Sequence, residues 1–298
     1  MNRNLVSLLL VGALLMAGSS VLWAENDAAV DEGTIVWVTD RDGEGRLNLW
    51  SINPDGTAAS QVTRGFVQAL FPAISPCGDL VAFSSADTGT WAIYIIGIDG
   101  TGLRRFTRFS SAVPDWSPDG EKLIFNSDHD DEPVDVPDLW GMNLDGTNKV
   151  EYLDSPPTAD FNPQWAPSGE TILFVSNRDG NYNLYLMDAD GSNIRRLTDD
   201  PANEYNPCWS PDGTKIAYTS DRAGTTDVCV IDADGTNVTC ITSHSGADHT
   251  PDWSPAGDRI VFVSDRSGQI DLWIVDADGS NPQQLTNDLA PDLHPDWR

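Results

Sequence analysis

The sequence predicts an all-β protein with the architecture of a six-bladed β-propeller, and three observations carry this prediction. A Pro-x-Trp-Ser-Pro-Asp-Gly phrase recurs about every 44 residues, each repeat contains four short strand-like segments, and a last copy of the phrase stands alone at the C-terminal end while the first repeat lacks one. Each repeat then corresponds to one blade of four antiparallel strands, and six blades surround a central channel.

The repeat is clearest in the second half of the chain. Pro207–Gly213 is followed 44 residues later by Pro251–Gly257, and 44 later again by Pro295–Arg298. Upstream copies of the phrase begin at Pro163, Pro114 and Pro72, at steps of 44, 49 and 42 residues. A nearly constant period of this length is typical of repeat architectures in which one supersecondary unit is stacked many times.

Within a repeat the residues favour strands. Lys215–Ser220 and Asp227–Ile231 alternate apolar and polar residues, Val238–Thr242 forms a third run, and the segment around Trp209 supplies a fourth. Asp-Gly pairs, which suit tight hairpin turns, recur at 55–56, 99–100, 145–146, 190–191, 234–235 and 278–279.

The two ends of the repeat array complement each other. The first repeat starts at Gly33–Thr39, which corresponds to the second strand of the other units, and Pro295–Arg298 corresponds to the missing first strand. We therefore expect the C-terminal strand, with Trp297, to pair into the first blade and close the ring, which removes the open sheet edges of an unclosed array.

The N-terminal region differs from the repeats. Residues 1–24 have Arg3 followed by an apolar run from Leu5 to Met16, and they predict a secretory signal peptide, with an uncleaved anchor as the alternative. Residues 25–32 form a short linker and residues 33–298 the propeller. The expected location is the periplasm or the extracellular medium. The net charge of −29 disfavours nucleic acid and an anionic membrane as partners, and we expect a monomer.

The four cysteines divide into a pair and two single residues. Cys229 and Cys240 lie symmetrically about the Asp-Gly turn at 234–235, so a two-residue hairpin would place them opposite each other. An exported protein could form a disulfide there, and two buried thiols are the alternative. Cys77 and Cys208 fall in different blades and are expected to stay unpaired.

Blade three contains an insertion. Its step is five residues longer, and the extra length falls in Asp128–Asp138, where like charges and two prolines predict a protruding loop. A solvated insertion is favoured over a cation or partner site.

The complete repeat resembles the WD40-like (PD40) repeat of the TolB propeller. The resemblance rests on Pro-x-Trp-Ser-Pro-Asp-Gly, an apolar strand, Ser-x-Arg-x-Gly, a second apolar strand, Asp-Ala-Asp-Gly-Ser/Thr-Asn and a closing Leu-Thr, and it covers residues 33–298. It implies a six-bladed propeller that binds a peptidoglycan-associated lipoprotein at one face. That family has an additional N-terminal α/β domain, for which residues 25–32 leave no room.

Most repeated side chains have a structural interpretation. The tryptophans of the phrase, Trp116, Trp165, Trp209, Trp253 and Trp297, are expected to pack between neighbouring sheets. Arg41, Arg178, Arg222 and Arg266 share one repeat position and could each bridge to a carboxylate of the neighbouring blade. The Asp-x-Asp-Gly turns offer too few oxygen ligands for a calcium loop.

The candidate binding residues precede the Pro-x-Trp phrase, where the innermost strand of each blade would start at the channel rim. Acidic residues recur three positions before the proline, with amides and histidines beside them. The set is Asp160, Asn162, Glu204, Asn206, Asp248, His249, Asp292 and His294. Such an arc suits a cation, a basic peptide or a sugar, and the alternative is that the carboxylates cap strand turns. A divalent cation held by His249 and His294 at the channel mouth is a further alternative, and no other cofactor is indicated.

The motifs of common enzymes are absent from the sequence. It contains no Gly-x-Ser-x-Gly, His-Glu-x-x-His or Cys-x-x-Cys motif and no phosphate-binding glycine loop. The sequence therefore predicts an exported, non-catalytic scaffold that presents its channel face to an envelope or secreted protein. The alternative is a propeller lyase or glycosidase that acts on a saccharide with the rim carboxylates and histidines.

Overall fold

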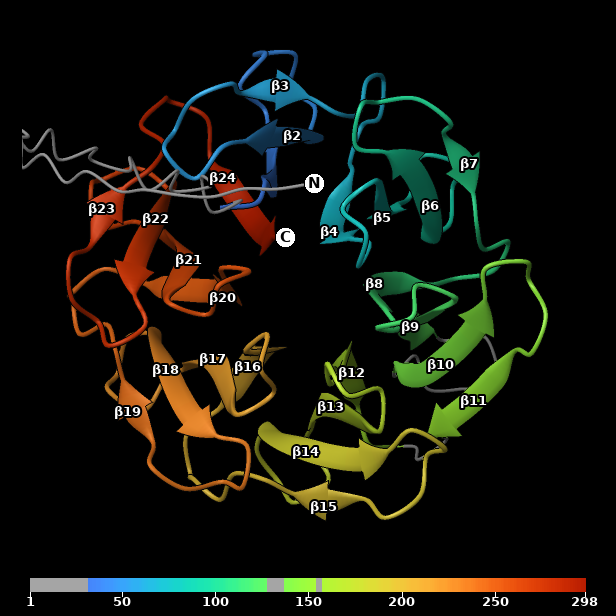
Figure 1. Cartoon of the computed structure of the whole chain (residues 1–298), viewed down its shortest axis with the longest axis vertical. Helices are drawn as coiled ribbons and strands as arrows, with labels where there is room; N and C mark the ends of the chain where they lie inside the picture. The colour runs from blue at the N-terminus through green and yellow to red at the C-terminus, as the bar shows by residue number, and fades with distance from the viewer. Residues whose placement is uncertain (1–31, 128–136, 154–156) are drawn as a thin grey trace, which may run out of the picture. The chain divides into compact units, whose positions relative to one another are not determined.

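The computed structural model describes residues 32–127, 137–153 and 157–298. Their regular structure consists of 24 strands in six four-stranded sheets. Figure 1 shows the sheets arranged as blades around a central axis. The predicted all-β, six-bladed propeller is confirmed. The predicted signal peptide and linker, residues 1–32, lie outside the described residues except for Glu32.

In every blade the strands follow one another outward from the channel, and in blade 1 the C-terminal strand takes the innermost place. Blade 1 contains β24 (Asp292–Trp297), β1 (Ile35–Thr39), β2 (Asn48–Ile52) and β3 (Ser60–Gln61), and blade 2 contains β4 (Leu70–Ile74), β5 (Leu80–Ser85), β6 (Ala92–Gly97) and β7 (Arg104–Arg105). Blade 3 contains β8 (Ala112–Trp116), β9 (Lys122–Ser127), β10 (Asp138–Asn143) and β11 (Val150–Leu153), and blade 4 contains β12 (Asp160–Trp165), β13 (Thr171–Ser176), β14 (Asn183–Asp188) and β15 (Arg195–Arg196). Blade 5 contains β16 (Glu204–Trp209), β17 (Lys215–Ser220), β18 (Asp227–Asp232) and β19 (Thr239–Cys240), and blade 6 contains β20 (Asp248–Trp253), β21 (Arg259–Ser264), β22 (Asp271–Asp276) and β23 (Gln283–Gln284).

The ring closes within blade 1, as the sequence predicts. The C-terminal strand β24 pairs antiparallel with β1, with Ile35 opposite Trp297 and Thr39 opposite Asp292. Beyond the strand ends, the backbone N–H of Arg298 donates to the carbonyl of Thr34 at 3.1 Å. Figure 1 shows β24 beside the N-terminal strands of blade 1.

The core lies between neighbouring blades. The second strand of each blade is apolar on both faces because each face packs against an adjacent sheet, and Ile260–Val263 of β21 is fully buried. The repeated tryptophan fills the gap: Trp297, 1% exposed, lies in one cluster with Ile35 of blade 1 and Val261 of blade 6. The wedge position predicted for these tryptophans agrees with this packing.

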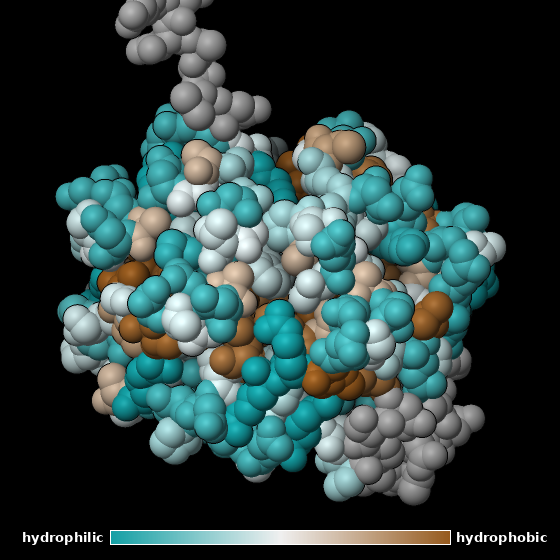
Figure 2. All heavy atoms as spheres, turned by 60° about the horizontal axis from the view of Figure 1, so that its bottom comes forward, coloured by the Kyte–Doolittle hydropathy of each residue, from teal (hydrophilic) through white to brown (hydrophobic). Residues whose placement is uncertain are grey.

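The outer rim is protected against pairing with other sheets. The outermost strands are two residues long in every blade except blade 3, and β7 and β15 are each an Arg-Arg pair. Short, charged edges are a known protection against edge-to-edge association. Figure 2 brings the rim beside blades 4 and 5 forward and shows hydrophobic patches separated by hydrophilic side chains. Ile194 and Val238, 40% and 41% exposed, lie just before the edge strands of these two blades.

The antiparallel order gives the ring two different faces. The loop face carries the starts of the innermost strands, the loops from second to third strands and the connections between blades. The turn face carries the tight Ser-Pro-x-Gly and Asp-Gly turns. On the turn face the Asp of each Asp-Gly pair accepts hydrogen bonds within its own turn. Asp234, for example, accepts from both the N–H and the hydroxyl of Thr236, at 3.0 and 2.6 Å. The predicted insertion Asp128–Asp138 lies outside the described residues up to residue 136, and β10 begins at Asp138.

Candidate functional site

The central channel holds a cavity of about 90 Å³ that is built by the innermost strands of the six blades. Each strand contributes three consecutive residues with a proline in the middle. The lining residues are Phe71–Ala73, Val113–Asp115, Asn162–Gln164, Asn206–Cys208, Thr250–Asp252 and His294–Asp296. The cavity therefore lies at the prolines of the repeated phrase, two to four residues further along each strand than the acidic positions.

A bulge in every innermost strand turns the residue before the proline towards the channel. These residues have positive φ angles between 47° and 53°, and each strand shifts its register against the second strand at this point. Positive φ is unfavourable for β-branched residues such as Val113 and Thr250. Strained backbone of this kind is often found where side chains are aimed at a function. The signal that the sequence offered was a proline within a strand, which cannot donate to the ladder and favours a bulge.

The four predicted rim carboxylates do not reach this cavity. Asp160, Glu204, Asp248 and Asp292 are the first residues of their strands, and each is fully buried. Three of them form ion pairs: Arg178–Asp160 at 3.0 Å, Arg222–Glu204 at 3.0 Å and Arg266–Asp248 at 2.7 Å. In each pair both residues belong to the same blade. The prediction that these arginines bridge to a neighbouring blade was therefore wrong.

The fourth carboxylate, Asp292, and the fourth arginine, Arg41, do not pair with each other. Asp292 accepts a hydrogen bond from the indole N–H of Trp37 at 2.8 Å, and burial raises its pKa to about 6. Arg41 occupies the position of the paired arginines, but it forms its ion pair with Asp288 at 2.9 Å, in the connection that leads into β24. The acidic arc is therefore part of the framework on the loop face.

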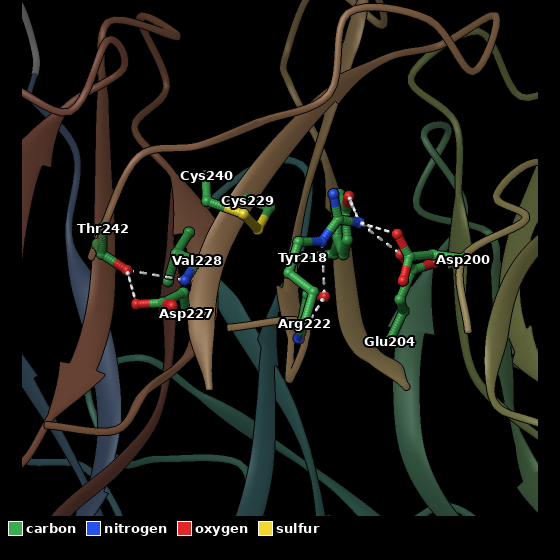
Figure 3. The surroundings of a disulfide bond; sticks show 10 residues. Asp200, Glu204, Tyr218, Arg222, Asp227, Val228, Cys229, Cys240 and Thr242 are labelled. Atoms are coloured by element: carbon green, nitrogen blue, oxygen red, sulfur yellow. Dashed lines mark hydrogen bonds and ion pairs between the residues drawn. A yellow bond between two sulfur atoms is a disulfide. The ribbon is translucent and has the colours of Figure 1, made fainter. Parts of the chain in front are cut away.

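Aromatic rings complete the arginine clusters. The guanidinium of Arg266 lies 5.1 Å from the ring centroid of Phe262 and 4.9 Å from that of Trp273, in addition to its carboxylate partner. In blade 5 the corresponding Arg222 donates to the hydroxyl of Tyr218 at 3.1 Å and to Glu204. Figure 3 shows Arg222 between these groups. These contacts fix the loop that follows the second strand in blades 5 and 6.

The predicted amides and one predicted histidine do line the cavity. Asn162 donates to the side-chain oxygen of Asn206 at 3.3 Å, and the ring of His294 lies 4.3 Å from that of Phe71. His249 lies one position earlier in its strand, and Thr250 takes the lining position in that blade. The lining is therefore half polar and half apolar.

Two polar atoms of the lining have no partner among the described residues. They are Nδ1 of His294 and Oγ1 of Thr250, and both atoms are buried. Burial, reinforced by His249 nearby, lowers the pKa of His294 to about 4, so its imidazole is neutral at pH 7 and Nδ1 can act as an acceptor. The described residues contain no group of three or more His, Cys, Asp or Glu side chains that could hold a metal ion.

Three aspartates on the turn-face side of the cavity were not singled out by the sequence analysis. Asp115, Asp252 and Asp296 follow the proline in their strands, and each accepts the backbone N–H of the next blade: Trp165 at 2.7 Å, Trp297 at 2.6 Å and Ile74 at 2.8 Å. Burial raises the pKa of all three, to about 7 for Asp115 and about 6 for Asp296. The sequence signal was Pro-Asp-Trp in three blades where the others have Ala, Gln or Cys.

Cys229 and Cys240 form a disulfide bond between β18 and the edge strand β19, where they are directly opposite. Figure 3 shows this bond between the Arg222 cluster and the Asp227–Thr242 pair. In the other blades the same two positions hold a tryptophan or tyrosine opposite a long polar side chain, such as Tyr185 opposite Arg196. Cys77 and Cys208 are unpaired.

Fold and site together define a six-bladed β-propeller with a narrow, half-polar central cavity. Residues 135–247 match the PD40 family, described as the TolB beta propeller domain. The structure of TolB from Acinetobacter baumannii superposes with a TM-score of 0.79 at 24% identity, covering 89% of this chain and 66% of that chain. The predicted resemblance to the TolB propeller is confirmed by this family match and the shared fold.

Other relatives show how widely the fold is used. The protein Atu1656 of Agrobacterium fabrum, described as uncharacterized, is 32% identical over 115 residues, which is 36% of this chain and 38% of the relative. An oligogalacturonate lyase in complex with manganese has a TM-score of 0.59 at 16% identity, covering 85% of this chain and 74% of the lyase. This chain thus spans less than half of the curated relative, and its fold occurs in an enzyme as well. Among the described residues, no helix could span a membrane.

Proposed function

We propose that the protein is an exported, non-catalytic scaffold that binds another protein on its loop face, with one side chain of the partner entering the central cavity. The observation that carries this proposal is the lining of the cavity. It is half polar, and it holds two buried polar atoms without protein partners, on His294 and Thr250. Its volume of about 90 Å³ is well below the ~300–1,000 Å³ of usual ligand pockets. A single side chain fits this space better than a whole cofactor.

Exposed apolar side chains favour the loop face as the binding face. The connections on this face carry Leu289 and Val67, which are 89% and 60% exposed. Exposed apolar residues of this kind are typical of protein interfaces.

The ion pairs and hydrogen bonds of the carboxylates support a binding role over catalysis. A glycosidase or lyase needs carboxylates that are free to donate and accept protons. The loop-face carboxylates are held by arginines or Trp37, and those beside the cavity bind backbone amides. Asn162, Asn206, His249 and His294 are then proposed as contact residues, and the four buried carboxylates as positioning residues.

The proposed partner and location are suggested by features of the sequence and by the disulfide. The N-terminal apolar segment favours export, and the disulfide suits an oxidising compartment such as the periplasm. The resemblance to the TolB propeller makes a peptidoglycan-associated lipoprotein the first partner to test. We propose that the protein acts as a monomer.

Site-specific photocrosslinking tests the proposal. A photoreactive amino acid replaces Leu289 on the loop face or, as a matched control, Val238 beside the turn-face end of blade 5. With a purified peptidoglycan-associated lipoprotein we expect crosslinking at position 289 and not at 238. We also expect the affinity to fall when Asn206→Ala and His294→Ala are combined. Crosslinking at 238 alone, or an unchanged affinity in the double variant, would reject the proposal.

A saccharide lyase is the second candidate, favoured by the fold shared with the oligogalacturonate lyase. It predicts turnover of oligogalacturonate in the presence of Mn²⁺ that is lost in the double variant Asp248→Asn, His294→Ala. We expect no turnover. Turnover that depends on these residues would replace the scaffold proposal.

A further inference from the structure

Three aromatic residues form a strip on the loop face at the junction of blades 4 and 5. Phe161 and Tyr205 are the second residues of β12 and β16, and Tyr182 directly precedes β14. The ring centroids of Phe161 and Tyr182 are 5.3 Å apart, and those of Tyr182 and Tyr205 are 5.4 Å apart. All three side chains are partly exposed. We call Phe161, Tyr182 and Tyr205 the aromatic strip.

A hydrogen-bond network fixes the loops that carry the strip. The side chain of Asn203 accepts the backbone N–H of Tyr182 at 3.2 Å and donates to Asp221 at 2.9 Å. The backbone N–H of Asn203 donates to the other oxygen of Asp221 at 2.7 Å. The strip and the Asp221 carboxylate are therefore held in place before any ligand binds.

Asp221 forms no ion pair with a cation in the described part of the chain. The neighbouring arginine, Arg222, forms its ion pairs with Glu204 and Asp200 instead. The carboxylate lies close to the strip, because the side chain of Asn203 bonds both Asp221 and the backbone N–H of Tyr182. Burial, with Asp221 and Tyr182 nearby, raises the pKa of the Tyr205 phenol. The hydroxyls of Tyr182 and Tyr205 have no hydrogen-bond partner in residues 32–127, 137–153 or 157–298, so they are open to a ligand.

We propose that the aromatic strip and Asp221 form a subsite for an arginine side chain of the bound partner. A guanidinium is flat and weakly hydrated, so it can stack on a tyrosine ring and pair with a carboxylate at the same time. The net charge of −29 favours a basic partner segment. This subsite rests on the proposed protein-binding function and specifies the chemistry of the partner.

The angles between the rings separate this ligand from a sugar. Tyr182 is inclined by 74° to Phe161 and by 46° to Tyr205, so the three rings do not form one flat platform for a saccharide. One planar group on one ring, next to a carboxylate, matches the arrangement better.

A small-molecule titration tests the subsite. The probe is N-acetylarginine amide, added to the full mature protein with ¹³C-labelled tyrosine rings and followed by NMR. We expect saturable shifts of the Tyr182 and Tyr205 resonances. The citrulline analogue, which has the same shape without the charge, should bind about fivefold more weakly or worse, as expected for the loss of a cation–π contact of about 1 kcal/mol.

The chain offers a matched control for Asp221. Asp265 holds the N–H of Ala247 at 2.8 Å in blade 6, as Asp221 holds that of Asn203, but His249 takes the place of Tyr205 there. Asp221→Asn should weaken arginine binding about fivefold, and Asp265→Asn should leave it within about twofold. Both substitutions keep an acceptor for the backbone N–H of the loop, and Asp221→Asn also loses the bond from the side chain of Asn203. Circular dichroism checks the fold.

Three results would overturn the subsite: no saturable shift of either ring, equal binding of the citrulline analogue, or equal losses in the two variants. Tighter binding of a neutral disaccharide than of the arginine probe would overturn it as well. If the arginine probe fails while crosslinking through position 289 persists, only the subsite is rejected and the scaffold function stands. If both fail, both proposals are rejected.

Discussion

Asp252, in the innermost strand of blade 6, accepts a 2.6 Å hydrogen bond from the backbone N–H of Trp297 in the closing strand. Trp297 belongs to blade 1, so this bond joins the two blades between which the ring closes. On the other side of the closing strand, Asp296 accepts the N–H of Ile74 in blade 2 at 2.8 Å. Carboxylates of the cavity therefore hold the closing strand on both sides, and ring stability should depend on their ionisation.

The first prediction concerns pH and uses Asp115, whose bond to Trp165 is of the same kind. Burial raises its folded-state pKa from 3.8 to about 7, offset in part by Trp165 and Arg298 and increased by Asp296. The folded state thus holds a proton that the unfolded chain releases. Its contribution to stability is complete below about pH 4 and is lost as the pH rises through 7. We expect the free energy of unfolding to fall over this window by at most about 4 kcal/mol.

Urea unfolding of the wild type and of Asp115→Asn between pH 4 and 8 measures this effect. The asparagine keeps an acceptor for Trp165 but does not titrate, so the variant should show the shallower decline. His294 acts in the opposite direction, because its lowered pKa of about 4 makes stability rise with pH up to about 6.5. The comparison between variant and wild type removes the His294 contribution. Parallel pH profiles would contradict the prediction.

The second prediction concerns the buried ion pair of blade 6. Arg266→Ala leaves the carboxylate of Asp248, fully buried, without its 2.7 Å partner, and should lower the free energy of unfolding by about 3–5 kcal/mol. Arg46→Ala is the control, because Arg46 is exposed and its ion pair with Glu44 is long, at 3.9 Å. It should change stability by less than about 0.5 kcal/mol. Both values come from urea unfolding at pH 7.

A double variant tests whether Arg266 stabilises the blade through its charge or through its packing. The double variant Asp248→Asn, Arg266→Gln removes both charges and should be less destabilised than Arg266→Ala alone, since no unpaired charge is left buried. A double variant that is at least as unstable as the single one would show that the arginine acts through packing on Phe262 and Trp273 instead.

The fold could be predicted from the sequence to the level of single strands, and the site only in part, because Asn162, Asn206 and His294 line the cavity but the carboxylates do not. The period of the repeat and the displaced Pro295–Arg298 segment determine six blades and their closure, because each repeat is one unit of four strands. The rim was predicted by counting back from the proline, which assumes a regular strand. The bulge at the residue before the proline breaks that count, so Asn162 faces the cavity while Asp160 is buried.

The pairing of Asp160 with Arg178 was within reach of sequence reasoning. Antiparallel pairing of β12 and β13 sets Asp160 opposite Ser176, two residues before the arginine. That register makes a partner in the same blade closer than one in the next. The aromatic strip was out of reach, because it depends on how the Tyr182 loop packs against the following blade, which no periodicity records.

The third prediction concerns the disulfide of blade 5. Cys229 and Cys240 close an 11-residue separation, so the double variant Cys229→Ala, Cys240→Ala should lose about 2–3 kcal/mol of unfolding free energy. Dithiothreitol should lower the melting temperature of the wild type but not that of the double variant. Equal melting temperatures of oxidised and reduced wild type would contradict a stabilising role.

Blade 4 supplies a matched replacement for the disulfide. Tyr185 and Arg196 occupy the corresponding positions there and are directly opposite each other. The variant Cys229→Tyr, Cys240→Arg should recover part of the lost stability and show no response to dithiothreitol. No recovery would mean that the surroundings of Cys229 are shaped for the disulfide and not for a ring.

The last prediction tests ring closure at its tightest point. A Cβ added at Gly33 would lie 2.5 Å from the carbonyl oxygen of Arg298, which directly follows the closing strand, and Gly33 has a φ of +77°. Gly43 has nearly the same φ, +71°, but a Cβ there meets no atom within 4 Å. Gly43→Ala should therefore cost only the left-handed penalty of about 1 kcal/mol, while Gly33→Ala must also push the closing strand away and should cost at least about 2 kcal/mol more. Urea unfolding of both variants gives the difference. Equal losses would mean that the C-terminal strand does not seal the ring at Gly33.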